Sequence, residues 1–199
     1  MRWFSTSSDI SDSSSDEELM QAVATGNTQA FDQLYERYNR KMLHYFYRML
    51  NREEEKAQDM LQELFLKLVD KPHLFDPKRR FSTWIFAIAS NMVKNEYRSR
   101  EVRKIMSRPG DMSQLKVSVP SSEEALHWQS FGEELGQALP KLSEIHRETF
   151  VLRYQEELSI KEISEIMQCT EGTVKSRIFY ALRKLAGHLH AFDPKENGI

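Results

Sequence analysis

Residues 159–185, SIKEISEIMQCTEGTVKSRIFYALRKL, decide the fold of this chain. Two helical patterns flank the three-residue break QCT. Ser159 and Glu162 have the spacing of a capping box, and Thr170 is placed to cap the second helix. Apolar residues follow three- and four-residue spacing in both helices. They are Ile160, Ile163, Ile166 and Met167 in the first helix, and Val174, Ile178, Ala181, Leu182 and Leu185 in the second. This layout predicts a helix-turn-helix.

The start of the second helix is built from weak helix formers. Gly172 costs about 1 kcal/mol relative to alanine in a helix, and Thr173 and Val174 are β-branched. A smooth, hydroxyl-bearing first turn suits close approach of a helix N-terminus to DNA phosphates. A helical wheel places a polar face opposite the apolar one. The outward residues are Gly172, Thr173, Ser176, Tyr180 and Arg183, flanked by Lys175 and Arg177. The alternative is that this face is merely solvated.

Helical patterns also dominate the rest of the 199 residues. We expect further helices at about 15–25, 28–50, 54–69, 82–104, 122–138 and 144–155. No segment predicts a strand. The Ser/Asp-rich residues 1–15 and the aperiodic residues 107–121 are typical of flexible chain. The predicted fold is all-α, with two helical domains at 16–106 and 122–190, a flexible linker at 107–121, and tails at 1–15 and 191–199.

Charge is distributed unevenly. The formal net charge is −2, but residues 76–108 hold nine Lys or Arg and three acidic residues, a balance of +6. Residues 1–24 hold one Arg and five acidic residues, a balance of −4. One basic segment of this size favours a nucleic-acid contact. A single cysteine excludes an internal disulfide, and no apolar run has the length of a signal peptide or membrane span. We therefore expect a cytoplasmic protein without membrane insertion.

Residues 139–185 resemble region 4 of bacterial RNA polymerase sigma factors of the extracytoplasmic-function (ECF) type. The resemblance rests on LPKLSEIHRETFVLRYQEELSIKEISEI and GTVKSR. It implies that the outward residues of the second helix read the −35 promoter element. Two positions depart from the family pattern. Gln168 stands where the turn usually has glycine, and Tyr180 stands where many members carry a basic residue.

Two segments of the N-terminal half resemble sigma region 2. AQDMLQELFLKLV (57–69) is similar to the part that binds the β′ clamp helices of core RNA polymerase, which implies roles for Asp59, Gln62, Glu63, Phe65 and Leu66. FSTWIFAIASNMVKNEYRSR (81–100) is similar to the part that binds the melted −10 element. The implied DNA-binding residues are Asn91, Lys94, Asn95, Tyr97, Arg98 and Arg100. Asparagine and tyrosine suit unstacked bases, and the cations suit phosphates.

The resemblance implies a sigma factor that binds core polymerase through β′ and the β subunit, directs it to promoter DNA, and helps to open the −10 region. It also implies a partner that inhibits it, an anti-sigma factor. Two alternatives remain: a stand-alone helix-turn-helix regulator, and an interaction module held by an anti-sigma factor. We find no motif for catalysis, a metal or a cofactor, because the six histidines are scattered and lack metal-ligand spacing.

Overall fold

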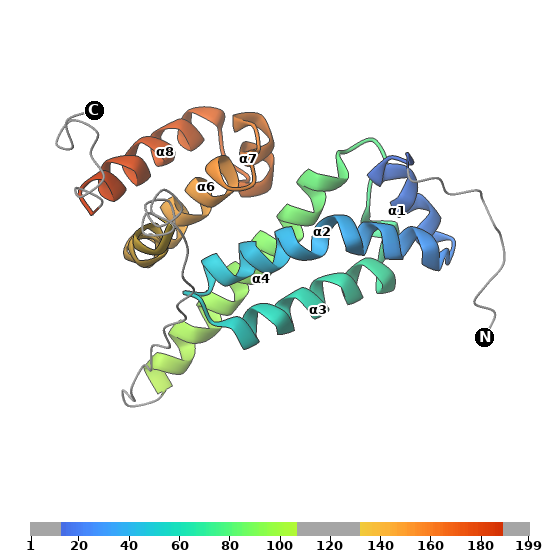
Figure 1. The fold of residues 1–199 in the computed structure, drawn as a ribbon, viewed down its shortest axis with the longest axis horizontal. Coiled ribbons are helices and arrows are strands. Elements are labelled where there is room, and N and C mark those ends of the chain that lie inside the picture. The colour runs from blue at the N-terminus through green and yellow to red at the C-terminus, as the bar shows by residue number, and fades with distance from the viewer. Residues whose placement is uncertain (1–12, 107–131, 189–199) are drawn as a thin grey trace, which may run out of the picture.

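The computed structural model describes residues 13–106 and 132–188. These residues form an all-α fold without strands (Figure 1). The longer helices are α1 (Asp16–Ala24), α2 (Thr28–Met49), α3 (Glu54–Asp70), α4 (Phe81–Met106), α6 (Glu144–Tyr154), α7 (Ile160–Met167) and α8 (Glu171–Ala186). Short 3₁₀ turns lie at Pro72–Leu74 and Leu139–Lys141, and residues 132–138 are helical. The predicted linker at 107–121, the tail at 191–199 and most of the tail at 1–15 lie outside the described residues.

Side-chain caps fix where most of these helices begin. Ser15 and Glu18 form a reciprocal capping box at α1, and Ser159 and Glu162 form another at α7. The side chain of Thr170 accepts a hydrogen bond from the Thr173 amide at α8. These bonds satisfy amide groups that a helix N-terminus leaves without an intrahelical partner. The caps predicted from the sequence at α7 and α8 are therefore confirmed, and α1 begins with a capping box of the same kind.

The start of α3 differs from its sequence pattern. The letters NREE at 51–54 predict an N-cap followed by acidic residues, but the N-cap residue is Glu53, and it makes no side-chain cap bond. Asn51 and Arg52 instead adopt left-handed backbone conformations, with φ of 55° and 70°. The α2–α3 turn therefore frees the Asn51 side chain for a contact elsewhere, described below.

Helices α1, α3 and α4 pack around α2, and the apolar stripe of α2 lies in the core that the four helices form. Tyr45 and Phe46 are fully buried, and the Tyr45 ring meets Phe86 of α4 edge to face at a centroid distance of 5.6 Å. Burying a side chain of this size contributes about 1.5–3 kcal/mol. Phe81 and Phe75 extend the cluster towards α1 and the 3₁₀ turn. This core holds α3 and α4 against α2 and against each other, and each of the two helices keeps an exposed face.

Helices α7 and α8 form the predicted helix-turn-helix, and α6 packs against both of them to complete a three-helix group. The residue that ends α7, Gln168, has φ 52° and ψ 49°, the left-handed conformation that glycine adopts most easily. Val174, Ala181 and Leu185 form the buried stripe of α8. Leu182 was expected on that stripe and is 41 % exposed. The prediction for Leu182 is wrong because the inward face of α8 is narrower than the apolar spacing indicates.

The helix-turn-helix group is packed against the first four helices. α6 lies along α2, and α7 lies against α4 (Figure 1). The buried apolar cluster is continuous from α1–α4 into Val151, Ile163 and Val174. The sequence predicts two helical units, and the structure adds that they share one core.

Candidate nucleic-acid and polymerase interfaces

The outer face of α4 carries a row of polar side chains. Asn91, Asn95 and Arg98 are exposed, and Lys94 is half-buried. Their spacing of three or four residues places Asn91, Asn95 and Arg98 on one side of the helix, as the sequence predicts. A cation and two amides on a shared face offer hydrogen bonds to base edges and attraction to phosphates.

A pocket of about 380 Å³ opens between α3 and α4 beside this row. Asn91, Asn95 and Trp84 line its α4 side, and Lys56 and Lys67 line its α3 side. Lys71, Glu63 and Glu96 line the pocket as well, and the two glutamates pair with Lys67 and Lys56. The indole ring and the two amides suit an unstacked base. The two lysines are not predicted as site residues from the sequence, because the helical pattern of α3 does not tell which of its edges faces α4.

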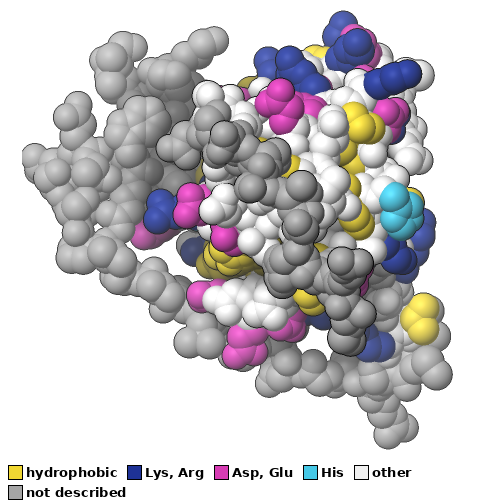
Figure 2. Space-filling model, turned by 90° about the vertical axis from the view of Figure 1, so that its right-hand side faces the viewer, with side chains coloured by type: hydrophobic (Ala, Val, Ile, Leu, Met, Phe, Trp, Pro, Cys, Tyr) yellow, Lys and Arg dark blue, Asp and Glu magenta, His cyan; other side chains and the backbone are white. Residues whose placement is uncertain are grey.

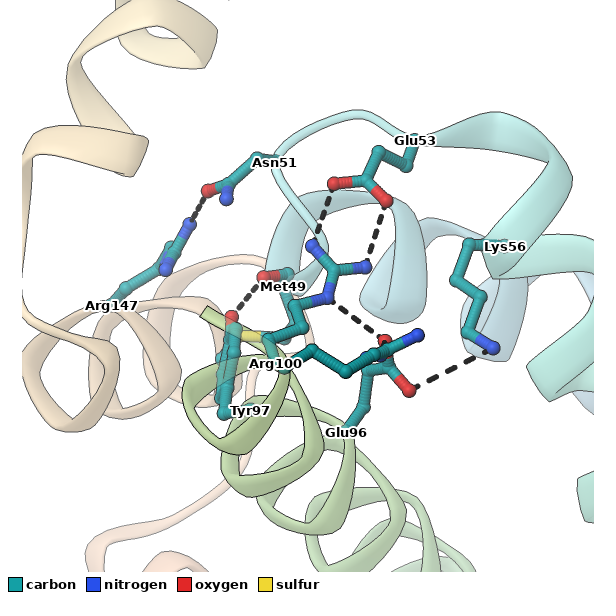
Figure 3. Close-up of polar contacts among 9 residues, drawn as sticks. Met49, Asn51, Glu53, Lys56, Glu96, Tyr97, Arg100 and Arg147 are labelled. Carbon is teal, nitrogen blue, oxygen red and sulfur yellow. Dashed lines mark hydrogen bonds and ion pairs between the residues drawn. The ribbon is translucent and has the colours of Figure 1, made fainter. Parts of the chain in front are cut away.

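Arg100 is half-buried, and its guanidinium bonds to carboxylates of the protein (Figure 3). Its guanidinium donates to both Glu53 oxygens at 2.6 and 2.7 Å, and to Glu96 at 2.9 Å. Lys56 and Arg103 also pair with Glu96. Burial alone would raise the pKa of Glu96, but the hydrogen bond from Arg100 and the three cations hold that pKa below its ordinary value. Arg100 therefore joins α4 to the start of α3, and the phosphate contact expected of it is replaced by this network.

Tyr97 was expected among the DNA-binding residues and is buried. It is 8 % exposed, and its hydroxyl donates to the backbone oxygen of Met49 at the end of α2 (Figure 3). Burial raises the pKa of Tyr97 to about 12. The guanidinium of Arg147, from α6, lies over the ring at 5.8 Å from its centroid. In this arrangement the ring cannot stack on a base, which corrects the expectation from the sequence.

The predicted polymerase-binding edge of α3 is partly on the surface. Asp59, Gln62, Glu63 and Leu66 are exposed, and Leu66 keeps 62 % of its surface in contact with solvent. Phe65 is 4 % exposed and lies against the rings of Phe31 and Tyr35. Phe65 is therefore a core residue that anchors α3 on α2, and its assignment as a surface contact is wrong. An exposed leucine beside carboxylates remains, a pattern that fits a protein partner.

The outward face of α8 is exposed as the sequence predicts. Gly172, Lys175, Ser176, Tyr180 and Arg183 are exposed, and Thr173 and Arg177 are half-buried. A methyl group added at Gly172 would find Thr170 Oγ1 at 3.8 Å, so the fold does not require glycine there. The use of Gly172 for close approach by a ligand therefore stays a prediction.

Arg177 braces the turn of the helix-turn-helix. Its guanidinium lies 3.4 Å from Cys169 Sγ and 4.0 Å from Met167 Sδ. Cys169 is half-buried and packs against the core, as expected of a small packing residue. The side chain of Arg177 thus reaches back from the predicted phosphate-binding flank, and it links that flank to the turn.

Basic side chains gather at the α1 end of the molecule. Lys78, Arg79 and Arg80, just before α4, are all exposed. The space-filling view of this end shows Lys and Arg side chains along its upper and right-hand edges, with hydrophobic and acidic side chains among them (Figure 2). The Glu17 side chain accepts a hydrogen bond from the Phe81 amide at 2.8 Å, and so fixes the start of α4 beside this basic loop. The loop extends the positive surface of α4.

Two further features are absent from residues 13–106 and 132–188. These residues contain no group of three metal-ligating side chains. In the same part of the chain, no helix combines the length and apolar character needed to cross a membrane.

Two family models match the chain. The Sigma-70 region 2 model matches residues 34–103, and the Sigma-70 region 4 model matches residues 132–185. The first range covers α3, most of α2 and most of α4. The second covers the helix-turn-helix group. The matched ranges therefore hold the exposed faces of α3, α4 and α8 described above.

Curated relatives agree with these matches. The chain is 33 % identical to the ECF RNA polymerase sigma factor SigW of Bacillus subtilis, over 81 % of this chain and 91 % of that protein. It is 33 % identical to the RNA polymerase sigma-H factor of Pseudomonas aeruginosa, over 83 % and 89 % of the two chains. It is 31 % identical to the ECF RNA polymerase sigma-E factor of Haemophilus influenzae, over 83 % and 90 %.

Solved structures share the fold. CnrH, in complex with the cytosolic domain of CnrY, matches with a TM-score of 0.65 and 25 % identity, over 89 % of this chain and 99 % of that one. The sigma factor RpoE of Bartonella quintana, in complex with the anti-sigma factor NepR, matches with a TM-score of 0.65 and 22 % identity over 82 % and 98 %. Sigma factors are DNA-binding regulatory proteins rather than enzymes. With its region 2 and region 4 in order, this chain belongs to the ECF RNA polymerase sigma factors.

Proposed function

We propose that this sigma factor binds core RNA polymerase through α3, reads the −35 element with α8 and captures the melted −10 strand on α4, in the cytoplasm. The observation that carries the proposal is the pocket between α3 and α4. Asn91 and Asn95 line it together with an indole ring and lysines, and Arg98 lies exposed on the same face of α4. A solvated surface helix needs no such cavity, whereas an extruded base does.

The roles of the α4 residues follow from their positions. Asn91 and Asn95 supply amides to the base edges, because both line the pocket. Lys94 and Arg98 supply charge to the phosphates on either side. Asn91→Ala should therefore lower discrimination between −10 sequences on single-stranded DNA. Arg98→Ala should lower affinity for all of them, with a shallower dependence on salt.

The roles of the α8 residues divide in the same way. Ser176 and Tyr180 lie near the centre of the outward face, where base edges would be met, and Lys175 and Arg177 lie on its flanks. Selection on a randomised −35 library tests this assignment. Ser176→Ala and Tyr180→Ala should change the selected sequence, whereas Lys175→Ala should weaken binding to all sequences about equally. A changed consensus for Lys175→Ala and none for the other two would overturn the assignment.

The exposed edge of α3 is the proposed docking site for the β′ clamp helices, and we place a second contact on the β subunit. Leu66 supplies apolar area, and Asp59 and Glu63 supply charge on the same helix. Reversing the charge of Asp59 and Glu63 together should abolish co-purification with core polymerase. Unchanged co-purification of this double variant would reject the docking site.

An anti-sigma factor is also proposed as a partner. The supporting observation is that two similar solved structures, CnrH with CnrY and RpoE with NepR, are complexes, the second with a protein that is named an anti-sigma factor. The proposal predicts a chain that is inactive in a stoichiometric complex and active when released. A stand-alone regulator would instead bind its operator tightly with no polymerase present.

A further inference from the structure

Buried polar side chains join α6 to the region 2 helices. Arg147 and Glu148 are adjacent in α6, and each is 3 % exposed. The guanidinium of Arg147 donates to Asn51 Oδ1 in the α2–α3 turn while it covers the ring of Tyr97 (Figure 3). The Tyr45 hydroxyl donates to Glu148 Oε1 at 3.1 Å. In the described residues, the buried charged side chains are therefore those at this contact, beside the apolar cluster that the two helix groups share.

Charged side chains surround this contact. Arg80, before α4, pairs with Glu162 of α7 at 2.9 Å. Glu156, just after α6, faces Arg48 and Lys41 of α2. Burial raises the pKa of Glu156, and these two cations oppose that rise. Burial likewise lowers the pKa of Arg48, against the charge of Glu156. Opposite charges thus face one another across the contact. Each charged group loses hydration while the contact is closed, which costs free energy.

The closed contact leaves polar groups incompletely satisfied. Arg147 Nε is buried and has no hydrogen-bond partner in the described part of the chain. Water would reach this nitrogen and the Glu148 carboxylate as soon as α6 moved away. Interfaces between domains that move are polar in this way, since both states must be tolerable. These features lower the free-energy cost of opening the contact.

Promoter geometry makes opening necessary. This step rests on the proposed function. Elements centred at −10 and −35 lie about 25 base pairs apart, which is about 85 Å at 3.4 Å per base pair. A compact chain of 199 residues has a radius of gyration of about 16 Å, and hence a diameter of roughly 40 Å. The closed arrangement cannot place α4 and α8 on both elements at once, and it also covers Tyr97.

We propose that the contact between Asn51 and Arg147 is a latch. It holds region 4 closed over Tyr97 in the free protein, and it is released when the chain engages core polymerase. Asn51 is suited to this role by its left-handed backbone, which projects the amide towards α6 and which asparagine tolerates better than most residues. Arg100 donates two hydrogen bonds to Glu53, which lies two residues after Asn51 in the same turn. The turn is therefore fixed to α4 of region 2, while the Asn51 side chain can contact α6.

Two substitutions at Asn51 separate the latch from the fold. Asn51→Gly keeps the left-handed turn and removes the acceptor, so it should open the chain. Asn51→Asp keeps the turn and offers Arg147 a carboxylate, so it should close the chain further. Arg147→Ala removes the donor and should act like Asn51→Gly. Helical circular dichroism equal to that of the wild type identifies variants that keep their fold.

Energy transfer between two dyes measures the closed fraction. Cysteines are placed at Arg40 on α2 and Lys184 on α8, both exposed, in a Cys169→Ser background. We expect a mainly high-transfer population in the free wild type. Asn51→Gly and Arg147→Ala should raise the open-to-closed ratio about tenfold, and Asn51→Asp should lower it. Added core polymerase should convert every variant to low transfer, with apparent affinity rising in step with the open fraction.

Each outcome decides the matter. Transfer that is the same in all four proteins would overturn the latch, and so would a shift in transfer that leaves the affinity for core polymerase unchanged. If core polymerase binds none of the proteins, the proposed function fails by itself. The order of transfer in the free proteins then still supports the latch if it follows the three substitutions, and overturns it if it does not.

Discussion

Arg98 and Arg100 lie two residues apart on α4. Arg98 is exposed, whereas Arg100 bonds to carboxylates within the protein. Arg100→Ala removes two hydrogen bonds to Glu53 and one to Glu96. The Arg100 side chain is 23 % exposed and its partners 45 % and 14 %, so solvent screens part of each bond. Bonds between charged groups contribute about 1.5–3 kcal/mol each when buried and far less when exposed. We expect a net loss of about 1.5–2 kcal/mol.

Thermal unfolding followed by circular dichroism measures this loss. A chain of this size loses about 2–4 °C in Tm per kcal/mol, so Arg100→Ala should lower Tm by about 3–8 °C. Arg98→Ala is the matched control. Arg98 is exposed, so its substitution should change stability by less than about 0.5 kcal/mol while it weakens DNA binding. Equal Tm values for the two variants would refute the structural role of Arg100.

The contribution of Arg100 to stability should depend on pH. The pKa of Glu96 is held below its ordinary value of 4.5, so the ionised carboxylate stabilises the folded state above that pH. This contribution is lost as the pH falls through the lowered pKa. The difference in Tm between the wild type and Arg100→Ala should therefore be largest near neutral pH and should narrow below pH 4.5. A difference that grows on acidification would contradict the assignment.

Four further substitutions give testable outcomes. Phe65→Ala should destabilise the chain by about 3–5 kcal/mol in chemical unfolding, because Phe65 is a core residue, whereas Leu66→Ala should leave stability unchanged and weaken binding to core polymerase. Gln168→Gly should stabilise the chain by up to about 1 kcal/mol by relieving the left-handed backbone, with −35 binding unchanged in a gel-shift assay. Gly172→Val should keep the helical circular dichroism and lose −35 affinity, since there is space for the side chain within the fold but not against DNA.

Local patterns predicted the helices well. The capping boxes of α1 and α7 involve residues three apart, so their partners are visible in the sequence itself. The strain at Gln168 was also visible, as a residue in the place of a glycine. The outward face of α8 follows from helical periodicity, since a helix packed on one side exposes the other.

Contacts between distant segments were not predicted. Phe65 and Tyr97 belong to helices whose exposed edges were correctly located, but their burial depends on Tyr35 and Met49 of another helix. Arg100 has the sequence spacing of a DNA-facing cation, and only the folded chain places Glu53 beside it. Asn51 has the sequence pattern of an N-cap. The left-handed turn that directs its side chain elsewhere depends on tertiary contacts.

Transcription with purified core RNA polymerase tests the central claim most directly. The claim is that this chain gives core polymerase its promoter specificity through α4 and α8. Run-off transcription from a genomic promoter library should start at a limited set of sites that share one −35 and one −10 sequence, and both Asn91→Ala and Ser176→Ala should reduce the output. A chain that binds duplex DNA tightly by itself, and that leaves the start sites of core polymerase unchanged, would contradict the account.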